Sequence, residues 1–286
     1  MADVVVVHGI FAERSSRAEM HDTWLAALRE GLRNVRFREV DGLTVECVFY
    51  GHLYNDGKAG PAWQYEIGDL APGLEEELLI SFAESVDDPS RDRDKDQDQD
   101  QAEAAGKAAY APRSVQWAID KLQKRKFLGG TNAAILGLVK QVARYLRDPE
   151  FKNKVHAEFS AAMETGPRLV IAHSLGSVVA YDWLRSNRPT SATTLITLGS
   201  PLGLRPVLRE LHPYLDSCQA PWPVGIDTWV NVAAKEDAVA TVKELDGLFA
   251  GKIHDLSAAN SRRTAHDAVV YLKNVRTSES VKVALG

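Results

Sequence analysis

The sequence has 286 residues, of which 45% are hydrophobic and 26% are charged, the balance of an ordinary globular protein. Its 34 lysines and arginines and 39 aspartates and glutamates give a formal net charge of −5, which argues against a nucleic-acid-binding surface. The two cysteines, Cys47 and Cys218, have no paired spacing, which excludes a disulfide scaffold and a zinc site built on cysteine pairs.

Targeting and membrane signals are weak throughout the sequence. The first residues lack the basic start, the apolar stretch and the small-residue cleavage site of a signal peptide. No window has the length and apolarity of a membrane span. We therefore expect a cytoplasmic protein whose residues 1–286 form a single domain.

The first predicted elements alternate between strand and helix. Residues 4–7 are four valines, which is typical of a short strand buried on both faces. A helix is predicted over residues 19–33, where apolar side chains recur at helical spacing. A second strand is predicted over residues 43–50, where apolar residues alternate with polar or smaller ones.

Residues 51–149 interrupt this alternation. Helical spacing of apolar residues predicts helices within 70–86 and 114–147. Between them lies a tract at 87–105 that consists mainly of charged and amide side chains. Because such a tract buries too little apolar surface to offset the entropy of ordering it, we predict a disordered loop there.

Strands and helices alternate again in the second half of the chain. Since strands that alternate with helices form mainly parallel sheets with helices on both faces, the sequence predicts an α/β fold. The predicted helices lie at 150–163, 175–187 and 265–274, and the predicted strands at 169–172, 195–198 and 228–232.

The most informative segment lies where the strand at 169–172 runs directly into the next helix. A serine on so sharp a strand-to-helix turn has a strained backbone, which holds its hydroxyl clear of the sheet. The residues two positions before and after Ser174 are Ala172 and Gly176, and their small size lets the strand and the helix approach each other. The segment therefore predicts Ser174 as a nucleophile.

This segment resembles the Gly-x-Ser-x-Gly nucleophile elbow of the α/β-hydrolase superfamily, with Ala172 in place of the first glycine. The likeness is to the lipase and serine-esterase branch, which includes GPI-inositol-deacylase-like members. Residues 4–10 resemble the opening strand and His-Gly oxyanion loop of that branch, and residues 195–202 resemble the strand and loop after the nucleophile helix. The resemblance covers residues 1–50 and 150–275. It implies an α/β-hydrolase fold in which the inserted residues 51–149 form a helical lid or cap.

The resemblance also implies the partners of the serine. In this family the acid follows the nucleophile and the histidine comes last. Asp237 fits the acid position after the strand at 228–232, with Glu236 as the alternative. His266 fits the histidine position before the last predicted helix, and His254 is its competitor. Ser200 is a less favoured nucleophile, because it lies beside a proline and no helix is predicted after it.

Two backbone N–H groups, those of Ile10 and Leu175, are the oxyanion-hole donors that the resemblance implies. His8, beside this loop, is interpreted as structural. The implied activity is hydrolysis of carboxylic esters by a carboxylesterase or lipase, through an acyl-enzyme and without a metal or organic cofactor.

The substrate and partners stay open at this point. A small-molecule or lipid ester is expected as substrate, while acyl or thioester transfer on the same triad and a non-catalytic scaffold protein are the alternatives. The insertion is expected either to pack on the fold or to contact an anionic membrane surface peripherally. The basic residues considered for such contact are Lys121, Lys124, Arg125, Lys126, Lys140 and Arg144.

Overall fold

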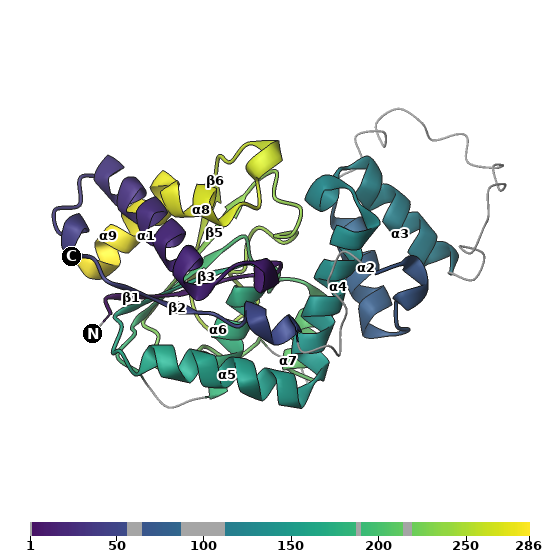
Figure 1. Ribbon diagram of the computed structural model, residues 1–286, viewed down its shortest axis with the longest axis horizontal. Helices are drawn as coiled ribbons and strands as arrows, with labels where there is room; N and C mark the ends of the chain where they lie inside the picture. Colours follow the sequence, from purple (N-terminus) through teal and green to yellow (C-terminus); the bar gives the residue numbers. More distant parts are fainter. Residues whose placement is uncertain (1, 56–64, 87–111, 187–189, 214–218) are drawn as a thin grey trace.

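The computed structural model describes residues 2–55, 65–86, 112–186, 190–213 and 219–286, and within them the chain folds around one parallel β-sheet (Figure 1). The sheet has six strands in the order β2-β1-β3-β4-β5-β6, and every neighbouring pair is parallel. The strands are β1 (Val4–Val7), β2 (Val45–Val48), β3 (Leu169–His173), β4 (Thr194–Leu198), β5 (Thr228–Ala234) and β6 (Ile253–Ala258).

Helices cover both faces of this sheet, which confirms the predicted α/β class. Figure 1 shows α1, α8 and α9 on one face and α5 and α6 on the other. The helices are α1 (Arg17–Asn34), α2 (Leu74–Ser85), α3 (Arg113–Lys124), α4 (Asn132–Arg147), α5 (Pro149–Met163), α6 (Leu175–Ser186), α7 (Arg205–Leu211), α8 (Ala268–Lys273) and α9 (Val275–Leu285). Short 3-10 turns include η1 (Ala12–Arg14), η3 (Gly51–Asn55), η8 (Phe127–Gly129) and η10 (Arg262–Thr264).

The valine run of β1 is buried on both faces, as its composition predicts. Val5 and Val7 belong to the core shared with α5 and α6, while Val4 and Val6 belong to the core shared with α1, α8 and α9. Successive side chains of a strand point to opposite faces, so a strand between two helical layers needs apolar residues at every position.

The predicted final helix at 265–274 has the wrong bounds. Asp267 accepts the N–H groups of Val269 and Val270 and so begins α8. Asn274 then ends α8 and, by accepting the N–H of Arg276, caps a further helix, α9. Strand β6 and helix α7 are two more elements that the sequence did not predict.

The inserted residues form a helical lobe of α2, α3 and α4 beside the carboxyl ends of the strands (Figure 1). The predicted helical stretch at 114–147 is two helices, because Lys126 and Leu128 have positive φ angles in the connection between α3 and α4. The apolar stripe of α4 is buried within the protein rather than exposed. The loop predicted at 87–105 lies outside the described residues.

Two of the basic residues considered for membrane contact, both on α4, have partners inside the fold, one within the lobe and one on α5. Lys140 pairs with Glu75 at 2.8 Å, and the Arg144 guanidinium lies 4.3 Å from the ring centre of Phe151. Among the helices that the structure describes, none has the length and apolarity required to cross a membrane.

Candidate active site

The strand order reverses direction between β1 and β3. After β1 the chain moves to β2 on one side, and it then returns to β3 on the other side. Open parallel sheets form a crevice at the carboxyl ends of the strands at such a switch point. His8 and Gly9 follow β1 at this point, and Ser174 follows β3. The topology therefore brings the two predicted site segments together.

Ser174 has the strained conformation predicted for it. Its φ is +54°, in the left-handed region that residues with a side chain rarely adopt, and its N–H donates to the carbonyl of Leu198 at 2.9 Å. A Cβ atom on Gly176 would lie 2.4 Å from the His8 carbonyl oxygen, and one on Gly9 would lie 2.6 Å from Ser174 Cβ. Only glycine fits at these two positions, because the backbones on either side of the serine are so close.

A continuous hydrogen-bonded chain joins the three predicted catalytic side chains. His266 Nε2 lies 2.8 Å from Ser174 Oγ, and His266 Nδ1 lies 2.9 Å from Asp237 Oδ2. The serine follows β3, the aspartate follows β5 and the histidine follows β6, so all three come from the carboxyl ends of strands.

Asp237 is fully buried and is ionised. Burial alone would raise its pKa, but the nearby His266 and the hydrogen bonds that the carboxylate accepts lower the pKa to about 2. Oδ1 accepts the N–H groups of Val239 and Ala240 at 2.9 and 3.3 Å. Because an ionised carboxylate can only accept, His266 Nδ1 carries the proton and Nε2 is left to accept the hydroxyl proton of Ser174.

Tyr271 on α8 is a site residue that the sequence analysis missed. Its hydroxyl donates to Asp237 Oδ2 at 2.7 Å and accepts the N–H of Ala234 at 2.8 Å. The tyrosine therefore connects the acid to the last residue of β5 and fixes the orientation of the carboxylate.

His173, next to Ser174, is the second residue that was missed. Burial lowers its pKa to about 3, so the imidazole is neutral. Its Nε2 donates to the backbone carbonyl of His266 at 2.9 Å, and the two rings lie 4.7 Å apart between their centres. His173 therefore holds the loop that carries the proposed base. It occupies a position that is variable in the elbow pattern, so the pattern alone could not indicate this contact.

Gly199 provides the space that the acid and the base occupy. Its φ is +57°, and a Cβ atom there would lie 2.7 Å from Asp237 Oδ2 and 3.1 Å from His266 Nδ1. The glycine after β4 is therefore required by both its backbone conformation and its neighbours.

The predicted oxyanion donors lie on the loop after β1, for Ile10, and at the start of α6, for Leu175. Within the described residues, neither the Ile10 N–H nor the Leu175 N–H has a hydrogen-bond partner. His8 stabilises the loop after β1: burial lowers its pKa to about 4, its Nε2 accepts the N–H of Tyr50 at 3.0 Å, and its Nδ1 donates to the Gly9 carbonyl at 2.6 Å. Both nitrogens of His8 are thus used within the fold, in keeping with the structural interpretation.

The alternative residues lie away from the chain of hydrogen bonds. Glu236 pairs with the exposed Arg262 at 3.2 Å, and His254 is exposed near the start of edge strand β6. The Ser200 hydroxyl is buried, where it bonds with Ser177 Oγ at 2.7 Å and accepts the N–H of Leu202.

Comparisons with known proteins do not assign the chain to a family. No protein-family model, curated protein or solved structure matches it. Among the described residues, no group of three or more His, Cys, Asp or Glu side chains is arranged to hold a metal ion. Any functional conclusion therefore depends on the geometry of the site itself.

Proposed function

We propose that this protein is a serine hydrolase of the α/β-hydrolase type that cleaves carboxylic esters. The observation that carries the proposal is the unbroken chain from Asp237 through His266 to Ser174, with 2.9 and 2.8 Å contacts. A serine hydroxyl is a weak nucleophile, and an adjacent base that is oriented by a third group is the arrangement that activates it.

The protonation states define the direction of proton transfer. Because Asp237 is ionised and holds the proton of His266 on Nδ1, the free Nε2 takes the proton of Ser174 Oγ as the serine attacks an ester carbonyl. The imidazolium that forms then gives this proton to the alcohol that leaves. Water attacks the resulting acyl-enzyme, with His266 again as the base.

The developing oxyanion requires hydrogen-bond donors beside the serine. The N–H groups of Ile10, on the loop after β1, and of Leu175, directly after Ser174, are suited to this role, because neither has a hydrogen-bond partner among the described residues. Leu175 is also the first residue of α6, where the helix dipole favours negative charge.

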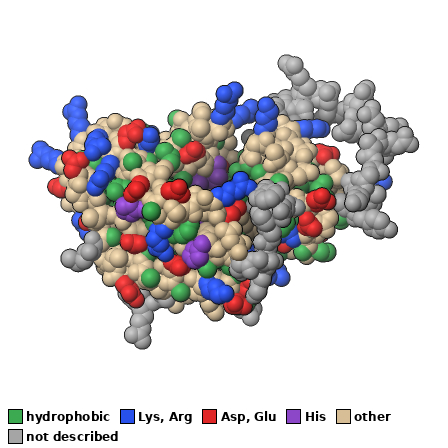
Figure 2. Space-filling view, in the orientation of Figure 1, with side chains coloured by type: hydrophobic (Ala, Val, Ile, Leu, Met, Phe, Trp, Pro, Cys, Tyr) green, Lys and Arg blue, Asp and Glu red, His purple; other side chains and the backbone are tan. Residues whose placement is uncertain are grey.

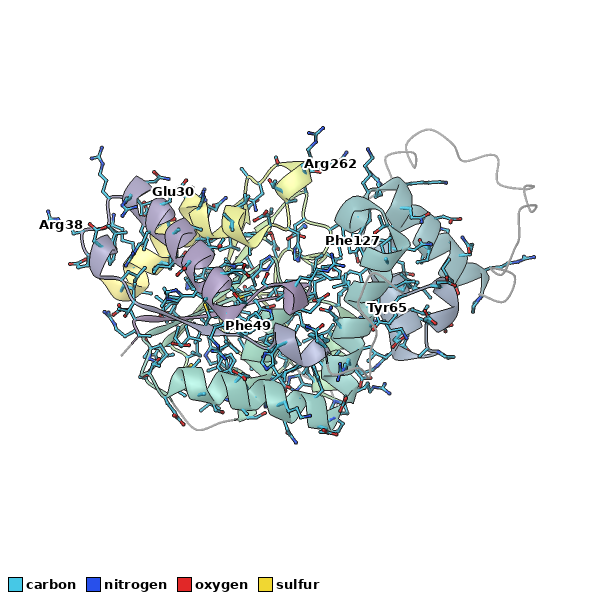
Figure 3. All side chains as sticks on the ribbon, in the orientation of Figure 1. Glu30, Arg38, Phe49, Tyr65, Phe127 and Arg262 are labelled. Carbon is cyan, nitrogen blue, oxygen red and sulfur yellow. The ribbon has the colours of Figure 1, made fainter. Side chains whose placement is uncertain are left out.

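The helical lobe is proposed to cover the substrate as a lid or cap. Figure 2 shows a hollow between the loop of η10 and the lobe, with a histidine side chain in its floor. Figure 3 places Arg262 on the η10 side of this region and Phe127 on the lobe side. A small-molecule or lipid ester would enter between these two walls.

Contact of the lobe with an anionic membrane surface is a second part of the proposal. Trp117 on α3 is 45% exposed, and Lys121 lies 5.2 Å from its ring centre. Lys124 and Lys126 are exposed nearby in the chain, so this surface combines positive charge with an aromatic side chain.

Flotation with phosphatidylglycerol vesicles at low salt tests the proposed membrane contact. We expect binding that is lost in Lys121→Glu/Lys124→Glu, and the absence of wild-type binding would contradict it. The cytoplasmic location remains a prediction.

The activity is tested with nitrophenyl esters of increasing acyl length. We expect hydrolysis by the wild-type protein and a loss of about 10⁴-fold or more in Ser174→Ala, because the nucleophile is removed. Ser200→Ala is the matched control and is expected to retain activity. Acyl transfer is the alternative outcome, and it would be recognised by product formation that requires an added alcohol or thiol acceptor.

A further inference from the structure

One buried side chain of the lobe reaches the proposed oxyanion loop. Gln141 on α4 is 4% exposed, and its Oε1 accepts the backbone N–H of Phe11 at 3.2 Å. Its Nε2 donates to Glu13 Oε2 at 3.3 Å. The backbone carbonyl of Gln141 accepts the hydroxyl of Tyr54 at 3.1 Å. Residues 128 or more positions apart in the sequence are thus joined by one amide.

The orientation of this amide is defined by its partners. A backbone N–H can only donate and an ionised carboxylate can only accept, so Oε1 must face Phe11 and Nε2 must face Glu13. Both ends of the Gln141 amide are therefore used in holding residues 11–13.

Phe11 requires such support because its backbone is strained. Its φ is +62°, in the left-handed region, although it carries a large side chain. Strained residues of this kind persist only where the surrounding structure determines them. The hydrogen bond from the Phe11 N–H to Gln141 fixes the peptide unit that joins Ile10 to Phe11.

The same contact decides which N–H group of the loop remains available. Gln141 occupies the N–H of Phe11, whereas the N–H of Ile10 has no partner among the described residues. The Gly9 carbonyl, on the other side of Ile10, is held by His8 at 2.6 Å. The loop is thus fixed from the body through His8 and from the lobe through Gln141.

We infer that Gln141 is a positioning residue for the oxyanion hole, so that the inserted lobe is part of the machinery that stabilises the transition state as well as a cover. This inference rests on the proposed function. It predicts that a protein in which the Gln141 amide is replaced binds substrate as before but stabilises the oxyanion less well.

The first test replaces Gln141 with methionine, which has a similar shape and lacks both hydrogen-bonding groups. We expect kcat for a nitrophenyl ester to fall about tenfold to a hundredfold with KM little changed, because a misplaced donor acts on the transition state. The affinity for a trifluoromethyl ketone, which forms a tetrahedral adduct, is expected to fall by a similar factor. Tyr145→Phe is the matched control: it removes a buried hydrogen bond one turn further along α4, and it is expected to leave kcat unchanged.

A second test exchanges the polarity of the contact. Gln141→Glu alone places two carboxylates together and is expected to lower kcat. In Gln141→Glu/Glu13→Gln, the new carboxylate accepts both the Phe11 N–H and the amide of residue 13, so we expect kcat within about threefold of the wild-type value. A residue that served only to stabilise the fold would change the amount of folded protein and leave the affinity of that protein for the trifluoromethyl ketone unchanged.

Different outcomes separate this inference from the proposal on which it rests. An active wild-type protein together with an equally active Gln141→Met protein would overturn the inference alone. An equal loss of kcat in Gln141→Met and Tyr145→Phe, without rescue by the double exchange, would also overturn it. A wild-type protein that neither hydrolyses esters nor reacts with fluorophosphonates would overturn the proposed function, and the inference with it.

Discussion

At the residue scale, the proposed chemistry depends on one carboxylate, that of Asp237, being ionised. Asp237 has four neighbouring donors, namely His266, Tyr271 and the N–H groups of Val239 and Ala240. These donors lower the free energy of the charged form in a site that burial would otherwise make unfavourable. In the proposed mechanism, Asp237 therefore determines the tautomer of His266 and, through it, the reactivity of Ser174.

Asp237→Asn tests this role directly. An asparagine can present an NH₂ donor to His266 Nδ1, and the ring proton then lies on Nε2. A protonated Nε2 cannot accept the hydroxyl proton of Ser174. We expect kcat to fall by about four orders of magnitude. Tyr271→Phe removes one of the hydrogen bonds to the same carboxylate and leaves the tautomer unchanged, so we expect a loss of about tenfold or less. Equal effects of the two substitutions in steady-state kinetics would contradict this account.

Gly199→Ala tests the space around the acid and the base. The new methyl group would lie within about 3 Å of Asp237 Oδ2 and His266 Nδ1, so both side chains must move, and we expect kcat to fall by about a hundredfold or more. Gly247→Ala is the control, because Gly247 also has a positive φ but a Cβ there would meet no atom within 4 Å. The control is expected to lose about 1 kcal/mol of stability and no activity. Retained activity in Gly199→Ala would show that Asp237 and His266 can be displaced without loss of function, which would contradict the expectation.

Local sequence signals account for some of these residues and not for others. Ser174 lies in a pattern with its own backbone geometry, and Asp237 and His266 follow in the order that the resemblance implies. Tyr271, His173 and Gln141 act through contacts that link distant segments, and no short pattern in the sequence encodes such contacts. Their roles become visible only when the helices are packed on the sheet.

At the scale of elements, a buried ionic cluster joins the lobe to α6, the helix that follows Ser174. Asp182 on α6 is 2% exposed and pairs with Arg185 at 2.6 Å and with Lys152 of α5 at 3.0 Å. It also accepts the hydroxyl of Tyr145 on α4 at 2.9 Å. Burial would raise its pKa, but these neighbours and His156 hold the pKa well below the ordinary value. Three helices are thus held together by one carboxylate.

Asp182→Asn is expected to destabilise the protein by about 2–4 kcal/mol, because it removes the charge that compensates two cations beside a buried position. Thermal unfolding measures this effect. Arg147→Gln breaks a pair between α4 and Glu210 in which the arginine is 62% exposed, and it should cost less than about 1 kcal/mol. A similar loss in both proteins would show that the cluster has no special role in stability.

The elements that the sequence predicted and those that it missed differ in their burial. Strands β1, β3 and β4 are buried at every residue, so their apolar runs stand out. Edge strand β6 has only two buried residues, Ile253 and Ala258, and its polar sequence does not indicate a strand. Helix α9 was missed because Asn274 was interpreted as the end of a helix, although its side chain also begins the next one.

At the scale of the whole molecule, two neutral buried histidines make stability depend on pH. The pKa values of His8 and His173 are lowered by burial to about 4 and about 3, from an ordinary value of 6.5. The unfolded chain therefore binds protons at these residues before the folded protein does. Their contribution to the free energy of unfolding is complete above pH 6.5 and is lost as the pH falls toward 4 for His8 and toward 3 for His173.

Urea denaturation at pH 7 and pH 4.5 tests this dependence. We expect the wild-type protein to lose about 2–3 kcal/mol more than His173→Gln between these two pH values, because glutamine keeps a donor for the His266 carbonyl and does not titrate. If both proteins lose the same free energy, His173 is not held neutral by burial in the folded state.

The nucleophile is identified by treating the folded protein with a fluorophosphonate and mapping the modified residue by peptide mass spectrometry. We expect a single adduct on Ser174 that is absent in Ser174→Ala and strongly reduced in Asp237→Asn. A protein that remains unmodified, or an adduct on Ser200 or another serine, would contradict it.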